Sequence, residues 1–164
     1  MSEILIRPIA LADIKQFQRV TDAVMRERKY LAFIEGFAID EVALFVARNI
    51  RLRNPQMVAD DDGRIVGWCD IRRETIPVYS HTGHLGMGLL ARYRAQGVGE
   101  RLIRAAIEAA RENGFERIEL TVYGRNAPAE ALYRKVGFVH EGTRVRGKKL
   151  DGEYDDVHMM GLLL

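Results

Sequence analysis

The stretch Leu89–Leu102, LLARYRAQGVGERL, constrains the fold more than any other part of this sequence. An apolar run, Leu85–Ala91, stops at a basic turn, RYR, which is followed by the glycine-rich segment QGVG. A long pattern of apolar residues at helical spacing begins directly after these glycines. The order predicts a strand, then a glycine-rich turn, then the N-terminus of a helix.

The predicted turn is suited to bind an anion. The N–H groups of a first helical turn have no intrahelical partner, and the helix dipole adds partial positive charge at the same place. Gly97 and Gly99 lack a Cβ, so an anion can approach the backbone closely. Arg94 and Arg101 supply full positive charges nearby. These features together predict a cradle for a pyrophosphate group.

A second motif lies downstream, in Ile118–Phe138, IELTVYGRNAPAEALYRKVGF. An alternating strand ends in a polar turn, and Asn126 is placed to cap a following helix. Tyr133 lies seven residues after Asn126 and one helical step from Leu132, on the flank of the apolar stripe of that helix. A tyrosine in this position can direct its phenol across a cleft between two strands.

The two motifs together resemble the GNAT superfamily of N-acetyltransferases. Arg94-x-x-Gly97-x-Gly99 is similar to the acyl-CoA pyrophosphate loop of that family. The second motif is similar to the family pattern N-x-x-A-x-x-x-Y-x-x-x-G-F, which is matched here by Asn126, Ala129, Tyr133, Gly137 and Phe138. The resemblance covers roughly residues 65–164 and looks closest to the branch that acts on amino acids and other small amines.

The resemblance implies direct transfer of an acetyl group from acetyl-CoA to a primary amine in a ternary complex. It implies that a strand edge at Leu89, Leu90 and Ala91 binds the pantetheine arm, with a bulge that Gly86 and Gly88 permit. Asn126 would bind the cofactor arm, and Tyr133 would protonate the departing sulfur as general acid. The pyrophosphate would be bound by the loop residues Arg94, Gln96, Gly97, Val98, Gly99, Glu100 and Arg101.

The residue that accepts the proton of the amine is less well defined. Some relatives have a glutamate five residues before the asparagine, but that position is Thr121 here. Glu119, two residues earlier on the same strand face, is the first candidate, although it could equally be a surface carboxylate. Glu74 and His84 are the alternatives. The acceptor is expected to lie among the first two helices and the final hairpin. Tyr30, Phe33, Glu35 and Phe37 could line this site, and its aromatic residues suit an apolar or aromatic amine.

The pattern along the chain predicts an α/β fold, with a central mixed sheet of six to seven strands and helices on both faces. The strands His81–Ala91 and Arg117–Tyr123 enclose one helix, so they are expected to be parallel. Asp40 is expected to cap the second helix. The other expected strands are Ile4–Pro8, Gln56–Ala59, Arg64–Ile71, Val139–Arg146 and Tyr154–Leu163, and the expected helices are Ala10–Arg28, Glu41–Asn49, Val98–Asn113 and one from Asn126 to Gly137.

Length and composition narrow the functional classes. A chain of 164 residues suits a single N-acetyltransferase domain spanning 1–164. Twenty-five Lys and Arg residues against 23 Asp and Glu give no argument for a nucleic-acid or membrane partner. No apolar run approaches about 18 residues, and the charged N-terminal segment does not favour an export signal. Cys69 is the single cysteine and is expected to be a buried core residue, which fits the reducing cytoplasm. No metal is expected.

Two other functions stay open at this stage. The chain could acetylate the N-terminus of a protein or peptide, which would need a channel wide enough for an extended chain. It could instead be a non-catalytic acyl-CoA-binding regulatory module that has kept the cradle and lost the chemistry. Dimerisation is common among relatives, so a homodimer is possible.

Overall fold

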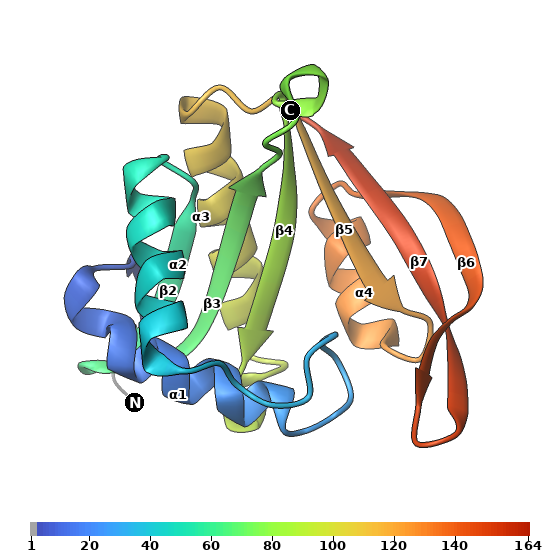
Figure 1. Cartoon of the computed structure of the whole chain (residues 1–164), viewed down its shortest axis with the longest axis horizontal. Helices are drawn as coiled ribbons and strands as arrows, with labels where there is room; N and C mark the ends of the chain where they lie inside the picture. The colour runs from blue at the N-terminus through green and yellow to red at the C-terminus, as the bar shows by residue number, and fades with distance from the viewer. Residues whose placement is uncertain (1–2) are drawn as a thin grey trace.

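One mixed sheet of seven strands organises the molecule, in the order β1-β2-β3-β4-β5-β7-β6 (Figure 1). The computed structural model describes residues 3–164. Within them the strands are β1 Leu5–Pro8, β2 Gln56–Asp61, β3 Arg64–Arg73, β4 Thr82–Leu89, β5 Arg117–Tyr123, β6 Val139–Leu150 and β7 Glu153–Leu163. The helices are α1 Ile14–Met25, α2 Ile39–Arg51, α3 Val98–Glu112 and α4 Ala127–Lys135.

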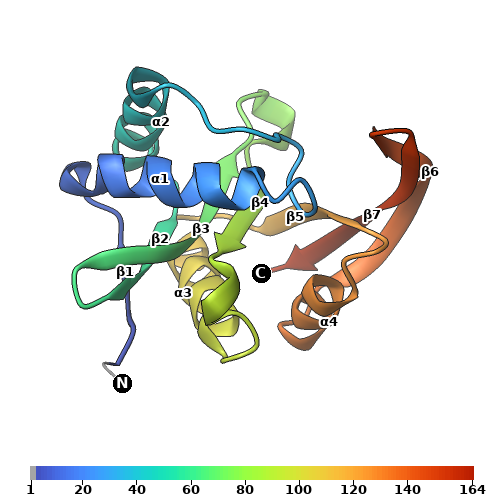
Figure 2. The same ribbon diagram turned by 90° about the horizontal axis from the view of Figure 1, so that it is seen from below.

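The helices cover both faces of the sheet, as predicted for the α/β class. Figure 2 shows α1 and α2 on one side of the sheet and α3 and α4 on the other. The core divides accordingly into two clusters of buried side chains. Val46, Val58 and Trp68 belong to the cluster on the α1 and α2 side, whereas Leu102, Ile118 and Tyr133 belong to the one beneath α3 and α4.

The parallel pair β4 and β5 is joined over a short distance only. The paired residues are Thr82 with Arg117, Gly83 with Ile118, and His84 with Glu119. Beyond them β4 continues to Leu89 and β5 to Tyr123, and the two strands diverge (Figure 1). The parallel pairing was predicted from the enclosed helix, but the early end of the pairing was not. The edge of β4 that faces β5 is therefore unpaired from Leu85 to Leu89.

Two predicted element boundaries are wrong for identifiable reasons. The first helix was expected over Ala10–Arg28, but it begins as a 3-10 turn, is α-helical only over Ile14–Met25, and ends before Arg28, whose φ is +57°. Asp40 was expected to cap the second helix, but the helix already begins at Ile39. Its first turn is closed by the Glu41 carboxylate, which accepts the Ala38 N–H at 3.0 Å.

The bulge expected in β4 is absent from its pairing with β3. The register runs without a shift from Arg73 and Gly83 to Gly67 and Leu89. The glycines of β4 instead allow close approach of side chains from β3. A Cβ at Gly88 would lie 2.3–3.0 Å from three atoms of the Trp68 ring. The outer edge of the indole therefore packs against the backbone of β4 at Gly88, and the strand stays regular.

This contact predicts that Gly88→Ala is destabilising. Trp68 is 4% exposed and packs edge-on against Phe17, with ring centroids 5.9 Å apart, so it has little room to move. We expect overpacking of this kind to reduce the free energy of unfolding by about 1–3 kcal/mol, measured by urea denaturation. Gly86→Ala on the same strand is the control, because a Cβ there would meet only ordinary contacts of 3.5–3.9 Å. Equal stability of the two variants would contradict this account.

Candidate active site

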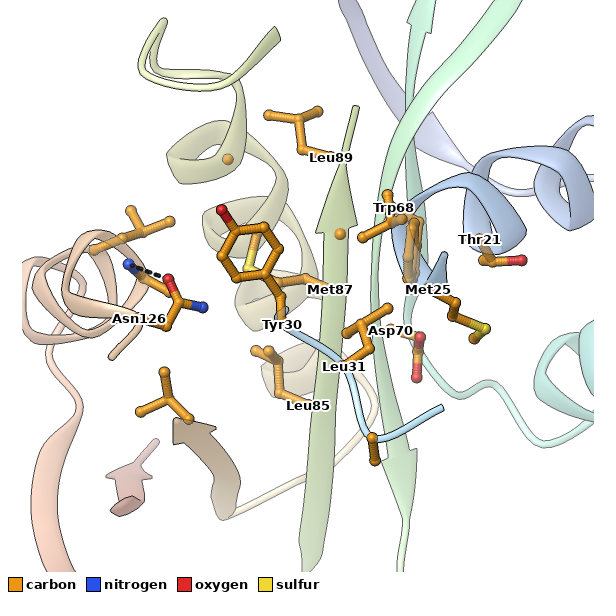
Figure 3. Close-up of a pocket in the computed structure, with 18 of the residues that line it drawn as sticks. Thr21, Met25, Tyr30, Leu31, Trp68, Asp70, Leu85, Met87, Leu89 and Asn126 are labelled. Atoms are coloured by element: carbon orange, nitrogen blue, oxygen red, sulfur yellow. Dashed lines mark hydrogen bonds between the residues drawn. The ribbon is translucent and has the colours of Figure 1, made fainter. Parts of the chain in front are cut away.

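A cavity of about 1280 Å³ follows the divergence of β4 and β5 and connects the two faces of the sheet. Residues from α1, the segment 26–38, α2, β3, β4, β5, α3 and α4 line it, and Figure 3 shows ten of them labelled. A cavity of this size exceeds the usual 300–1,000 Å³ of a small-molecule pocket. It can therefore hold two ligands that meet between the strands.

The glycine-rich turn that was predicted to bind an anion lies at one end of this cavity. Gly97 is the N-cap of α3, with a φ of +79° that an L side chain rarely adopts. The first helical hydrogen bond runs from Arg101 N–H to Gly97 C=O at 3.1 Å. The N–H groups of Val98, Gly99 and Glu100 precede that bond and have no carbonyl within the helix to donate to. These groups and the helix dipole can bind an anion, as the sequence predicted.

The two arginines expected to supply charge to the cradle have protein partners. Arg94 binds Glu27 at 2.8 and 2.6 Å, donates to the Leu89 carbonyl at 2.8 Å, and lies over the Tyr30 ring. Arg101 donates to the Ile4 carbonyl. Arg94 thus connects the cradle to the segment 26–38, and the Glu27 carboxylate neutralises its charge and raises its pKa. The cradle in this structure relies on backbone dipoles more than on these side chains.

The residues expected to bind the cofactor divide into two groups. Leu89, Arg94, Gly97, Gly99, Glu100, Asn126 and Tyr133 line the cavity. Leu90, Ala91, Gln96, Val98 and Arg101 are not among its lining residues. Leu90 donates its N–H to the Val66 carbonyl at 2.9 Å, so this N–H is already used within the sheet. Of the expected edge Leu89–Ala91, Leu89 lies on the part of β4 that is not paired with β5, and Leu90 follows that part.

Tyr133 is the buried residue of α4, whereas the sequence placed it on the flank of the apolar stripe. It is 7% exposed and packs against Phe138, with ring centroids 6.0 Å apart, while Leu132 is half-buried beside Gly99 in the cavity wall. Burial, with a smaller effect from the neighbouring Cys69, raises the pKa of the Tyr133 phenol far above its usual value. Tyr133 is therefore held protonated at the cavity wall and can act as a proton donor.

Asn126 has the helix-capping role that the sequence predicted. It precedes α4, and its Oδ1 accepts the Ala129 N–H at 3.4 Å. Figure 3 shows the side-chain amide directed toward the cavity. The cap fixes this side chain at the point where β5 turns away from β4, so it can donate to a ligand that lies between the strands.

Glu119, the first candidate for the base, does not line the cavity. It is the last residue of β5 that still pairs with β4, and Arg117 Nε lies 3.0 Å from its carboxylate. The alternatives Glu74 and His84 bind each other at 2.8 Å, and neither is among the lining residues. All three side chains lie at the closed end of the divergence, away from the cradle.

Three of the four residues expected to contact the acceptor line the cavity. Tyr30, Phe33 and Phe37 line it, and the rings of Phe33 and Phe37 meet edge to face with centroids 4.7 Å apart. Phe33 is 56% exposed, which leaves an apolar surface at the mouth. Glu35 is not among the lining residues.

Sequence reasoning missed two charged residues of β3 that line the same region, Asp70 and Arg72. Asp70 is 4% exposed, and its Oδ1 lies 3.1 Å from Arg72 Nε. Burial raises the pKa of Asp70 to about 6, an effect that Arg72 and Trp68 partly oppose. The only sequence signal was a carboxylate within an otherwise apolar strand, VGWCDI.

Within residues 3–164 no helix combines the length and apolarity needed to cross a membrane. Across the same residues, no three His, Cys, Asp or Glu side chains are placed to share a metal ion.

Comparison with known proteins connects this geometry to one family. Residues 17–138 match the model of the Acetyltransferase (GNAT) family. The chain is 39% identical to the L-amino acid N-acetyltransferase AaaT of Escherichia coli K12 over 107 residues, which cover 64% of this chain and 65% of that relative. It is 30% identical to an N-alpha-acetyltransferase of Sulfurisphaera tokodaii over 168 aligned positions, covering 96% and 92% of the two chains.

Solved structures agree with the fold. A GNAT-family acetyltransferase from Streptococcus pneumoniae superposes with a TM-score of 0.93 at 30% identity, covering 99% of this chain and 100% of that one. YncA from Salmonella typhimurium, solved with acetyl-CoA, superposes with a TM-score of 0.93 over 99% and 94% of the two chains. Its sequence identity of 17% shows the shared fold alone.

The cradle geometry predicts that Gly97→Ala weakens binding of coenzyme A, a pyrophosphate ligand. The substitution forces an L residue to a positive φ and adds a methyl group to the open space before the helix. We expect at least a tenfold rise in Kd by calorimetry, about 1.4 kcal/mol. Gly114→Ala is the matched control, because Gly114 has a φ of +73° and equally open surroundings after the other end of α3. Unchanged affinity in Gly97→Ala would contradict the assignment.

Proposed function

Because the chain belongs to the GNAT acetyltransferase family and is an acetyl-CoA-dependent N-acetyltransferase, we propose that its acceptor is the primary amine of a small molecule such as an amino acid. The observation that carries this proposal is the continuity of the cavity. It runs from the backbone cradle of α3, through the divergence of β4 and β5, to a charged pair beneath the segment 26–38. A cofactor arm and an acceptor can therefore meet between the strands.

The charge of the acceptor side favours a substrate that carries both an ammonium and a carboxylate group. Asp70 and Arg72 form a contact pair of opposite sign, and the Arg72 side chain is half exposed. An α-amino acid presents the complementary pair of charges at a similar separation, and guanidinium groups bind carboxylates well. Tyr30, Phe33 and Phe37 would then contact the side chain of the amino acid. The likeness to an L-amino acid N-acetyltransferase supports the same substrate class.

In the proposed reaction, the protein positions and polarises the reacting groups. The N–H groups of Val98, Gly99 and Glu100 bind the pyrophosphate, and Asn126 binds the cofactor arm. The unpaired edge of β4 offers backbone N–H groups to the thioester oxygen, which gains negative charge in the transition state. These donors are fixed by the sheet and need no reorganisation during the reaction.

Tyr133 is proposed to protonate the departing sulfur. The amine nitrogen forms a bond to the carbonyl carbon as the carbon–sulfur bond breaks, and the thiolate takes the phenol proton. The raised pKa keeps the phenol protonated before this step. The phenol gives up its proton only when negative charge develops on the sulfur beside it. The proton that the new amide nitrogen loses restores the phenol through solvent.

A second acceptor class, the N-terminus of a protein or peptide, is favoured by one observation. The relative that aligns over 96% of this chain is an N-alpha-acetyltransferase. The exposed Phe33 and Phe37 at the mouth could also contact an extended chain. We rank this class second because the charged pair lies inside the cavity and complements a carboxylate that a peptide N-terminus lacks.

The proposed setting is the cytoplasm. Cys69 is a free, fully buried thiol, and the structure needs no oxidising compartment. A homodimer stays a prediction, which sedimentation can test.

A thiol-release assay over a panel of amines tests the proposed acceptor. We expect kcat/KM for L-phenylalanine to exceed that for 2-phenylethylamine at least tenfold, because only the amino acid places a carboxylate against Arg72. A short peptide with a free N-terminus represents the second class, and a higher kcat/KM for it would reverse the ranking. Binding of coenzyme A without turnover of any amine would instead favour a non-catalytic acyl-CoA-binding regulatory module.

Tyr133→Phe tests the proposed acid. The ring contact with Phe138 is kept, so we expect KM to change little while kcat falls about 10- to 100-fold at pH 7. Tyr79→Phe is the matched control, because Tyr79 is exposed and does not line the cavity. An unchanged kcat in Tyr133→Phe would remove the tyrosine from the mechanism.

A further inference from the structure

A buried carboxylate on β3, that of Asp70, has so far been given a role in substrate binding but none in proton transfer. It is 4% exposed, lines the cavity, and its Oδ1 has no hydrogen-bond partner among the residues that the structure describes. The Arg72 contact at 3.1 Å does not have the alignment of a hydrogen bond. A buried carboxylate oxygen without a hydrogen bond costs free energy even beside a cation, so this oxygen is a candidate for contact with a ligand.

Strand β4 lies between Asp70 and the divergence, and the β4 residue paired with Asp70 is Gly86, which has no side chain. Asp70 pairs with Gly86 across β3 and β4, so both residues face the α1 and α2 side of the sheet. A Cβ at Gly86 would lie 3.5 Å from Asp70 Oδ2 and 3.7 Å from Oδ1, so the carboxylate is the nearest group to the space that a Gly86 side chain would enter. Neighbouring strands are about 4.8 Å apart. The carboxylate therefore lies one strand from the unpaired edge of β4.

We propose that Asp70 is the catalytic residue that accepts the proton of the acceptor amine, across the gap that Gly86 leaves in β4. The proposal rests on the proposed N-acetyltransferase reaction and deepens it by naming the base. It replaces the sequence candidate Glu119, which lies at the closed end of the divergence and is bound to Arg117. Figure 3 shows Asp70 on β3 among Trp68, Met25 and Leu31, which exclude water from one side of the carboxylate.

The proton balance is complete with this assignment. An amine of pKa about 8 to 10 arrives mainly as an ammonium ion. Asp70 takes one proton from it, and the freed lone pair attacks the thioester carbon as described above. The thiolate gains a proton from Tyr133, the second proton of the amide nitrogen restores the Tyr133 phenol through solvent, and Asp70 releases its own proton to water. The net products are the amide, the thiol and one proton.

Several other charged or titratable groups lie on the elements around Asp70, and a test must separate their effects from its own. Arg72 is its neighbour on β3 and favours the ionised carboxylate. The remaining groups on the elements around it are His84 with Glu74, Glu119 of β5, Glu41 of α2, and Glu27 with Arg94 and Tyr30 at the segment 26–38. His84 lies 2.8 Å from Glu74 and 3.9 Å from Glu119, so it needs its own variant.

The experiment measures kcat/KM against pH from 5 to 9.5 for the full chain, with an amino acid that the wild-type enzyme acetylates. In the wild type we expect kcat/KM to fall below pH about 6 as Asp70 becomes protonated. In Asp70→Asn we expect a loss of at least about 100-fold at pH 7. The variant depends on free amine, so its rate should rise about tenfold per pH unit up to the pKa of the amine.

Controls keep the result specific. Asp62→Asn makes the same chemical change in the exposed turn between β2 and β3 and should keep the wild-type profile. Asp70→Asn is nearly isosteric and removes a buried charge, so its Tm should equal or exceed that of the wild type, and its Kd for coenzyme A should be unchanged. Asp70→Glu should recover part of the rate and restore an acidic limb, which a merely structural role would not predict.

Three outcomes overturn the proposal. The acidic limb could persist in Asp70→Asn with little loss of rate. It could instead disappear in Glu119→Gln or His84→Gln, which would assign the base to one of those residues. Each of these results leaves the acetyltransferase function in place. Absence of thiol release by the wild-type enzyme with every amine would overturn the proposed acceptor chemistry and this assignment together.

Discussion

The early end of pairing between β4 and β5 is the constraint on which the rest of the site depends. Parallel strands in a sheet normally satisfy one another's backbone groups along their length. Here the pairing ends at His84 and Glu119, and both strands continue without each other. The separation exposes one backbone edge of β4 and opens a passage through the sheet. A cavity that connects both faces follows from this single local loss of hydrogen bonding.

Two glycines of β4 make room for larger side chains of β3 beside the passage. Gly88 lets the Trp68 indole lie against β4, which keeps the strand straight where a bulge was expected. Gly86 leaves open space over Asp70 on the same strand. The opposite side of the passage carries the buried Tyr133, whose proton is retained by desolvation. The two buried groups thus lie on opposite faces of the sheet, and the passage brings a ligand into reach of both.

The sequence predicted local features correctly where a residue interacts with its near neighbours along the chain. The glycine-rich turn places Gly97 at the N-terminus of α3, Asn126 caps α4, and the helix between β4 and β5 makes those strands parallel. The sequence was misleading where a distant partner decides. Arg94 is bound by Glu27, 67 residues away, and the pairing of Glu119 with His84 of β4 places it at the closed end of the divergence. Spacing alone cannot show such partners.

The sequence by itself determined the family resemblance, the order of the elements and the cradle, because these depend on periodicity and on turn chemistry within a few residues. Only the tertiary structure decided which side chains face the cavity. Asp70 and Gly86 are 16 positions apart, and nothing in either segment marks them as partners before the register of β3 and β4 is known. Side-chain direction in a sheet alternates with every residue, so one register fixes the chemistry of the whole face.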